Sequence, residues 1–170
     1  MHRRFAVTAN GSPSPSRGEI AMRREAAEPE ELRSLRDRIE IDALRAEFTD
    51  AAMMNDHVRL AALFVAEGVL RIPEAGIELV GRDSIRRLGQ QREAGFEVFV
   101  QTTHPGAVSV SGDTATGRAY LSEVIRMRDG AAHLNHGIYH DRYRRTPHGW
   151  RFTERVYEIR HREESSTAEH

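Results

Sequence analysis

Apolar residues recur every three or four positions over Leu32–Ala52, which predicts one long amphipathic helix. Pro29 and the two glutamates after it mark its start, because proline and acidic residues favour the first turn of a helix. The pattern ends near Asn55. A short second helix is expected over His57–Phe64, with Asp56 as its N-cap.

Turn residues then separate shorter elements. Two short strands, Val69–Ile72 and Ile77–Val80, flank a turn at Pro73–Gly76, and Asp83 is expected to cap a third helix over Ser84–Glu93. From there the alternation changes to a period of two, which predicts four further strands. These strands are Glu97–Val110, Thr114–Arg128, Ala132–Arg145 and Trp150–Arg160. Helices followed by an antiparallel meander indicate an α+β fold in which a curved sheet wraps the long helix.

The ends of the chain lack this patterning. The stretch Asn10–Gly18 is rich in Gly, Ser and Pro and can bury too little to offset its ordering entropy. We therefore expect disordered tails at residues 1–28 and 162–170 around a single domain at 29–161. Met22 is an alternative to Met1 as the start of the protein.

Composition narrows the function classes. The chain has 170 residues, 39% hydrophobic and 30% charged, with a formal net charge of -1, so no overall charge favours nucleic acid or an anionic membrane. Cys and Lys are both absent, which excludes disulfides, a Cys nucleophile and a Schiff-base lysine. No apolar run approaches the roughly 18 residues of a membrane span, and without an export signal the cytoplasm is the expected compartment.

Successive side chains of a strand point to opposite faces of a sheet, so counting residues from each turn suggests which polar side chains share a face. A two-residue loop at Asp129-Gly130 would place Glu123 opposite His136 on an otherwise apolar face. Even-length loops in the neighbouring hairpins would place His140 opposite Arg155, Ile138 opposite Tyr157, and His104 opposite Leu121. An odd loop or a bulge would reverse the parity. One side of the sheet would then carry His104, Glu123, His136, His140, Arg155 and Tyr157.

Ordinary structural roles compete with this interpretation. Glu123 and His136 could form a simple cross-strand pair, His104 could be a satisfied core histidine, and Asp56 could only cap a helix. Arg155 could bind a structural carboxylate. No metal is expected, because His136 and His140 would lie about 13 Å apart along one strand.

Five segments carry a family resemblance. They are FTDAAMMNDHVRLAALF, EGVLRIPEAGIELVGRDSIRRL, TTHPGAVSVSGDTATGRAY, HGIYHDRYRR and HGWRFTERVYEIR. Over Leu32–Arg160 the chain resembles the SnoaL-like branch of the nuclear-transport-factor-two-like superfamily, which includes polyketide cyclases, scytalone-dehydratase-like lyases and ketosteroid isomerases. The resemblance implies a cone-shaped α+β barrel, a homodimer, a deep apolar pocket and no cofactor.

The resemblance also transfers to single positions. His104 matches the family's pocket histidine, and Arg155 matches an arginine that some dehydratases use in the last strand. Phe48 and Met53 stand where dehydratase-like members have Tyr and Asp, so those two polar groups are missing here.

These observations lead to a hypothesis of a cofactor-independent lyase, isomerase or cyclase. It would act by acid–base chemistry on a small apolar carbonyl compound, polyketide-like or steroid-like. His104 would be the general base, Glu123 and His136 would share a proton, and Arg155 would stabilise an enolate. The expected substrate-binding residues are Phe48, Met53, Asp56, Ile138, His140 and Tyr157.

Two alternatives remain at this stage. A non-catalytic binding or dimerisation module is favoured by Phe48 and Met53, which make the helix side of the pocket apolar. A metal-dependent enzyme would retain zinc or iron through purification.

Overall fold

A computed structural model describes residues 29–166. Contacts divide the chain into two units, residues 1–33 and 34–170. The expected N-terminal tail and the alternative start at Met22 lie outside the described residues, as do the last four residues of the expected C-terminal tail.

The expected helices are present. They are α2 (Glu30–Met53), α3 (His57–Ala62) and α4 (Arg82–Gly95). Asp56 caps α3 as predicted, since its carboxylate accepts a hydrogen bond from the backbone N–H of Arg59. Asp83 does not cap α4. The N-cap is Gly81, and Asp83 lies in the first helical turn.

A six-stranded sheet follows the helices in the order β2-β1-β6-β5-β4-β3. Its strands are β1 (Phe64–Ile72), β2 (Ile77–Val80), β3 (Phe96–Ser111), β4 (Thr114–Met127), β5 (Ala131–Thr146) and β6 (Gly149–Ser166). The sheet is mixed rather than wholly antiparallel, because β1 pairs with β6 in parallel. A short 3-10 turn, η1 (Pro73–Ala75), connects β1 and β2.

Two element boundaries differ from expectation by more than two residues, since β1 begins at Phe64 rather than Val69 and β6 ends at Ser166 rather than Arg160. Phe64 begins β1 instead of ending a helix, and it is fully buried. The N–H of Phe152 donates to the carbonyl of Leu63, which ties this junction to β6. At the other end β6 continues to Ser166, beyond the expected Arg160.

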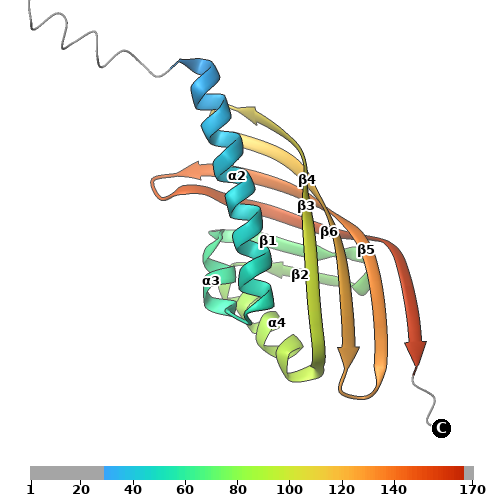
Figure 1. Ribbon diagram of the computed structural model, residues 1–170. Helices are drawn as coiled ribbons and strands as arrows, with labels where there is room; N and C mark the ends of the chain where they lie inside the picture. The colour runs from blue at the N-terminus through green and yellow to red at the C-terminus, as the bar shows by residue number, and fades with distance from the viewer. Residues whose placement is uncertain (1–28, 167–170) are drawn as a thin grey trace, which may run out of the picture. The chain divides into compact units, whose positions relative to one another are not determined.

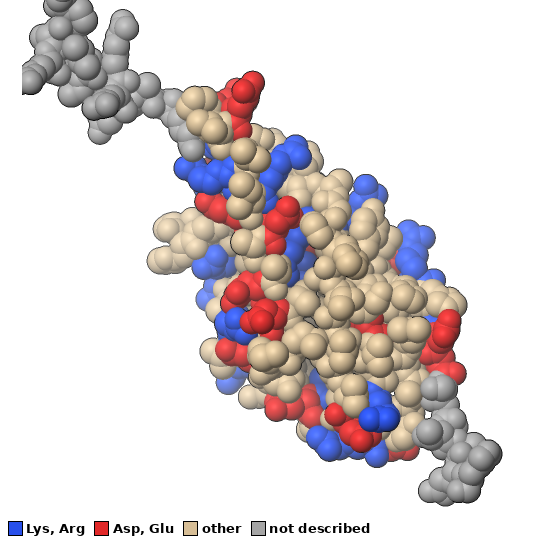
Figure 2. All heavy atoms as spheres, in the orientation of Figure 1, with Lys and Arg blue, Asp and Glu red and all other residues tan. Residues whose placement is uncertain are grey.

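Helix α2 lies across one side of the sheet (Figure 1). Phe48 of α2 makes edge-to-face contacts with Phe64, Tyr139 and Phe152 of three different strands, which forms the centre of the core. We call this side the helix-covered face and the opposite side the outer face. On the molecular face seen in Figure 2, acidic and basic side chains are interspersed rather than segregated.

The hairpin between β4 and β5 overturns the predicted parity. Its turn comprises three residues, Arg128–Gly130, between the facing residues Met127 and Ala131, so Glu123 lies opposite Asn135 and not His136. Gly130 has a φ of 92°, which lets the third loop residue adopt a left-handed conformation. The odd loop moves His136 to the outer face, where it pairs in register with Ser122.

Bulges reverse the parity in the flanking strands. The two-residue turns at Gly112-Asp113 and Pro147-His148 occur as predicted. A bulge then shifts the register in each hairpin. One extra residue lies in β3 between Pro105 and Val108, and another lies in β6 opposite the Arg142/Tyr143 step.

As a result, His104 faces Tyr120, and Arg155 faces Asp141 instead of His140. His140 lies opposite Val156 in the same register.

Candidate functional site

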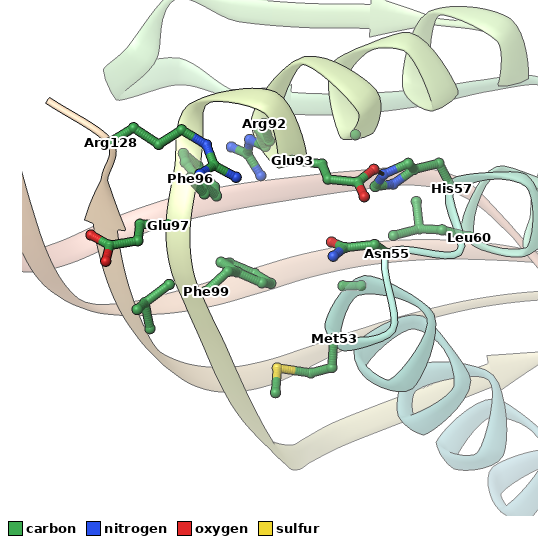
Figure 3. Close-up of a pocket in the computed structure, with 13 residues that line it drawn as sticks. Met53, Asn55, His57, Leu60, Arg92, Glu93, Phe96, Glu97, Phe99 and Arg128 are labelled. Carbon is green, nitrogen blue, oxygen red and sulfur yellow. Dashed lines mark hydrogen bonds and ion pairs between the residues drawn. The ribbon is translucent and has the colours of Figure 1, made fainter.

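A cavity of about 460 Å³ opens between the end of α2, α3, α4 and the start of β3 (Figure 3). Its wall is mixed, since six of the thirteen lining residues are polar or charged and the others are apolar side chains or glycine. The lining residues are Ala52, Met53, Asn55, His57, Leu60, Gly89, Arg92, Glu93, Phe96, Glu97, Val98, Phe99 and Arg128. We call this the outer cavity.

A second cavity of about 50 Å³ continues toward the core. It shares several wall residues with the outer cavity, including Leu60, Arg92 and Phe99. Its remaining wall includes three buried polar residues of the sheet, Gln101, Tyr139 and Tyr157, together with apolar side chains of α2, β1 and α4. We call this the inner cavity.

An imidazole–carboxylate pair lies at the wall of the outer cavity. His57 Nε2 is 2.9 Å from Glu93 Oε2, and the histidine side chain is only 11% exposed. Figure 3 shows the two side chains pointing toward one another, one from the start of α3 and one from α4. An ionised carboxylate can only accept, so Nε2 carries the hydrogen in this pair.

Gly89 explains how the ring fits against α4. A Cβ at this position would collide with the His57 ring. Glycine inside a helix costs about 1 kcal/mol relative to alanine, and here it makes room for the imidazole.

Arg92 is the cation that lines both cavities. Within residues 29–166 its guanidinium makes neither a hydrogen bond nor an ion pair, although the side chain is partly buried. The carboxylates nearby are already engaged, since Glu93 pairs with His57 and Glu97 pairs with Arg126 at 3.1 Å. Arg92 can therefore contact a negatively charged group of a ligand.

A buried network surrounds Glu123 behind the inner cavity. Gln101 Nε2 donates to Glu123 Oε1 at 2.6 Å, and the Tyr157 hydroxyl donates to Oε2 at 2.8 Å. Asn135 Nδ2 donates more weakly to Oε2 at 3.4 Å. Burial raises the pKa of Tyr157 above its ordinary value, and the nearby Glu123 carboxylate raises it further. Tyr157 thus remains a protonated donor.

A second buried network surrounds Asp141. Arg155 donates to both carboxylate oxygens of Asp141 at 2.8 Å, and the Tyr143 hydroxyl donates to Oδ2 at 2.7 Å. Burial by itself would lower the pKa of Arg155, but Asp141 outweighs it and the net shift is upward. The guanidinium also stacks within 4.2 Å of the ring centres of Phe48, Tyr139 and Phe152. Arg155 is enclosed by protein and lines neither cavity.

Four of the predicted site residues lie on the outer face, away from both cavities. His104 is exposed beside Tyr120, and His136 Nδ1 is 2.8 Å from the Ser122 hydroxyl. His140 pairs with Glu158 at 2.7 Å. Ile138 lies in the same strand, in register with Glu158. The predicted grouping of His104, His136 and His140 with Glu123 is therefore wrong, because the odd loop and the bulges turn the histidines outward.

The other predicted residues lie elsewhere. Phe48 and Tyr157 line the inner cavity, and Met53 lines the outer cavity, where its sulfur accepts the Gln101 backbone N–H at 3.0 Å. Glu123 and Arg155 are on the helix-covered face but behind the cavity walls. Asp56 caps α3 and pairs with Arg59 at 3.2 Å, outside the cavity lining.

Several polar residues that reach the cavities were not predicted from the sequence. They are Asn55, His57, Arg92, Glu93, Glu97, Gln101, Arg128 and Tyr139. One signal was available: Gly89 lies inside a predicted helix, which often indicates a close contact. The partner in that contact, His57, belongs to another helix and could not be identified from spacing.

Among the described residues, no three His, Asp or Glu side chains are grouped as metal ligands. None of the helices described here is long and apolar enough to cross a membrane.

Comparison with known proteins gives a consistent fold. A family model described as "SnoaL-like domain" matches residues 33–156. A solved structure from Novosphingobium aromaticivorans, provisionally named an aromatic ring hydroxylase, is 26% identical with a TM-score of 0.71, covering 78% of this chain and 94% of that one. An NTF2-like protein of the same organism is also 26% identical, with a TM-score of 0.59 and coverages of 85% and 90%.

A more distant structure is the hexachlorocyclohexane dehydrochlorinase LinA-type3 from Novosphingobium barchaimii. It is 17% identical with a TM-score of 0.73, covering 82% of this chain and 97% of that one, a likeness that shows the fold alone. No curated protein sequence matches the chain significantly.

Proposed function

This chain belongs to the SnoaL-like family, and from that premise we propose that it is a cofactor-independent enzyme that moves protons on a small, mainly apolar carbonyl compound. The reaction would be an isomerisation, an elimination or a ring closure. The observation that carries the proposal is the His57–Glu93 pair at the wall of a partly apolar cavity.

His57 is the proposed general base. Its imidazole would remove a proton from the carbon next to the carbonyl, and the electrons of that C–H bond would move onto the carbonyl oxygen as an enolate. Glu93 would orient the ring through Nε2 and would stabilise the imidazolium that forms. Arg92 would stabilise the enolate oxygen, since its guanidinium has no carboxylate partner among the described residues. Returning the proton elsewhere, or losing a leaving group, would complete the reaction.

The cavity supports this substrate class. The apolar part of its wall fits a hydrocarbon frame, polyketide-like or steroid-like in character, and a volume of about 460 Å³ suits a small molecule. One structural relative is named for the removal of hydrogen chloride from hexachlorocyclohexane, a lyase reaction on a small apolar ring. Met53 and Phe48 would contact the apolar frame.

Hydrogen–deuterium exchange tests the proposal without knowledge of the natural substrate. The protein would be incubated in deuterated water with small cyclic and aromatic ketones, and loss of the proton next to the carbonyl would be followed by NMR. We expect His57→Gln to lower the exchange rate by about 100-fold or more. Glu93→Gln should cause a smaller loss, because the base remains but loses its orienting partner.

His140→Gln is a matched control. His140 also pairs with a glutamate, at 2.7 Å, but on the outer face. Exchange should be unaffected by this variant. Equal losses in both histidine variants, or full activity in His57→Gln, would contradict the assignment of His57.

A binding protein without catalytic activity is the second candidate. It is favoured by the positions Phe48 and Met53, which put apolar side chains on the helix side of the cavities. Saturable ketone binding without any exchange above the buffer rate would favour this function over the enzyme.

We also propose that the protein forms a homodimer through the outer face. Val100 and Val124 lie directly opposite one another in the sheet, and both are exposed together with Tyr120. Leu134 and Ile138 of the next strand extend this apolar stripe. A second copy of the chain would remove it from water.

Light scattering coupled to size-exclusion chromatography would test the dimer. Val124→Asp should shift the protein toward monomer, because it would bury an unpaired carboxylate in the interface. Val80→Asp alters an exposed valine at the edge of the sheet and should leave the dimer intact. A wild-type protein that is monomeric at tens of micromolar would contradict the proposal.

A further inference from the structure

Gln101 has one polar atom that no described residue satisfies. The side chain is 4% exposed, and it lines the inner cavity. Its Nε2 donates both hydrogens, one to Glu123 Oε1 at 2.6 Å and one to the Tyr139 hydroxyl at 2.8 Å. Its Oε1 has no hydrogen-bond partner.

The orientation of this amide is fixed by its surroundings. Turning the amide over would point Oε1 at the Glu123 carboxylate, so that two acceptors would face each other. The amide nitrogen therefore faces Glu123, and the free atom is an acceptor rather than a donor. A buried acceptor without a partner is costly, so a group that donates to it would bind favourably.

Tyr139 has a hydrogen-bond donor that lacks an acceptor among the described residues. It is 3% exposed and lines the same cavity. Its oxygen accepts the Gln101 hydrogen bond, but within residues 29–166 its own O–H has no acceptor. Burial raises the pKa of Tyr139, so this hydrogen stays in place at neutral pH. Gln101 and Tyr139, which both line the inner cavity, thus have one free acceptor and one free donor.

A hydroxyl group satisfies both atoms at once, because it donates one hydrogen bond and accepts another. A carbonyl, an ether or a carboxylate oxygen could only accept, so each would leave Gln101 Oε1 without a partner. The volume of about 50 Å³ is enough for a hydroxyl and the carbon that bears it.

We propose that the inner cavity is a specificity site for a hydroxyl group of the substrate, held between Gln101 Oε1 and the Tyr139 O–H. The substrate is then a hydroxylated carbonyl compound whose apolar frame fills the outer cavity. This inference rests on the proposed function for the carbonyl and on the inner cavity alone for the hydroxyl.

Three ketones of similar shape test the proposal by calorimetric titration. The probes are acetophenone, 4'-hydroxyacetophenone and 4'-methoxyacetophenone. The hydroxyl probe should bind the wild-type protein at least about tenfold more tightly than acetophenone, and the methoxy probe should lose that gain because it cannot donate. Equal affinities for all three would mean that the cavity holds only a water molecule, which would overturn the proposal.

Matched variants assign the effect to the two side chains. Tyr139→Phe and Gln101→Leu should each reduce the ratio of the affinities for the hydroxyl probe and acetophenone severalfold. Tyr143→Phe is the control, because Tyr143 is equally buried but its hydroxyl donates to Asp141 and it does not line the cavity. A preference that survives both cavity variants, or that Tyr143→Phe also removes, would refute the assignment. The wild-type probe series remains decisive if a variant fails to fold.

The outcome is separable from that of the proposed function. Hydroxyl preference is a binding measurement and needs no turnover. Preference without deuterium exchange would leave the hydroxyl site standing and remove the enzyme proposal. Deuterium exchange without a preference for the hydroxyl probe would leave the enzyme proposal standing and remove the hydroxyl site.

Discussion

Two buried carboxylates reach the helix-covered face of the sheet, and their surroundings differ. Asp141 is held by the guanidinium of Arg155 and the hydroxyl of Tyr143. Glu123 accepts hydrogen bonds from the neutral groups of Gln101, Asn135 and Tyr157. Asp141 therefore serves to neutralise a buried cation, whereas Glu123 orients the neutral side chains that form the wall of the inner cavity.

The Asp141 pair gives a stability prediction. Asp141→Asn should lower the free energy of unfolding by about 3–5 kcal/mol, because it leaves the buried Arg155 without its counter-charge. Urea denaturation would measure the change. Glu67→Gln, which breaks the exposed pair with Arg144, should have little effect. Wild-type stability in Asp141→Asn would show that the pair contributes nothing to folding.

At the scale of elements, the site depends on how α3 and α4 pack. His57 is the first residue of α3, and its ring lies against Gly89 in the middle of α4. Glu93 is one helical turn further along the same face of α4, because residues four apart are neighbours on a helix. This spacing brings the carboxylate to Nε2 of His57.

Gly89→Ala tests that arrangement without changing any polar group. The added methyl would displace the His57 ring and separate it from Glu93, so the proposed exchange activity should fall at least about tenfold. Thermal stability should change little, because the better helix propensity of alanine offsets part of the collision. Gly95→Ala is a suitable control, since a Cβ there meets only the end of Met127 at 3.8 Å. Unaltered exchange in Gly89→Ala would contradict the role of the pair.

At the scale of the whole molecule, three of the four tyrosines belong to one buried layer. Tyr139, Tyr143 and Tyr157 are buried on the helix-covered face. Burial raises the pKa of each one, most directly through loss of contact with water. The layer couples the two buried carboxylate networks to the core.

The burial of these three tyrosines predicts how the stability of the fold changes at alkaline pH. Tyrosines of the unfolded chain ionise near pH 10, whereas these three stay protonated in the folded state. The unfolded state thus loses protons first, and stability should fall as the pH rises above about 10. The absorbance of three tyrosinates at 295 nm should appear together with the loss of circular dichroism. Ionisation of all the tyrosines with the fold intact would contradict their burial.

The sequence alone was sufficient for the family, the α+β fold and most element boundaries, because these follow from local periodicity and turn residues. It also identified Tyr157, Phe48 and Met53 near a cavity. It could not assign the outward-facing histidines, since one three-residue loop and the bulges in β3 and β6 each reverse the side to which a strand residue points. The pairing of His57 with Glu93, and the free atoms of Gln101 and Tyr139, depend on contacts between residues distant in sequence. Only the tertiary structure could decide them, because side-chain distance across packed elements is not encoded in the spacing of residues along the chain.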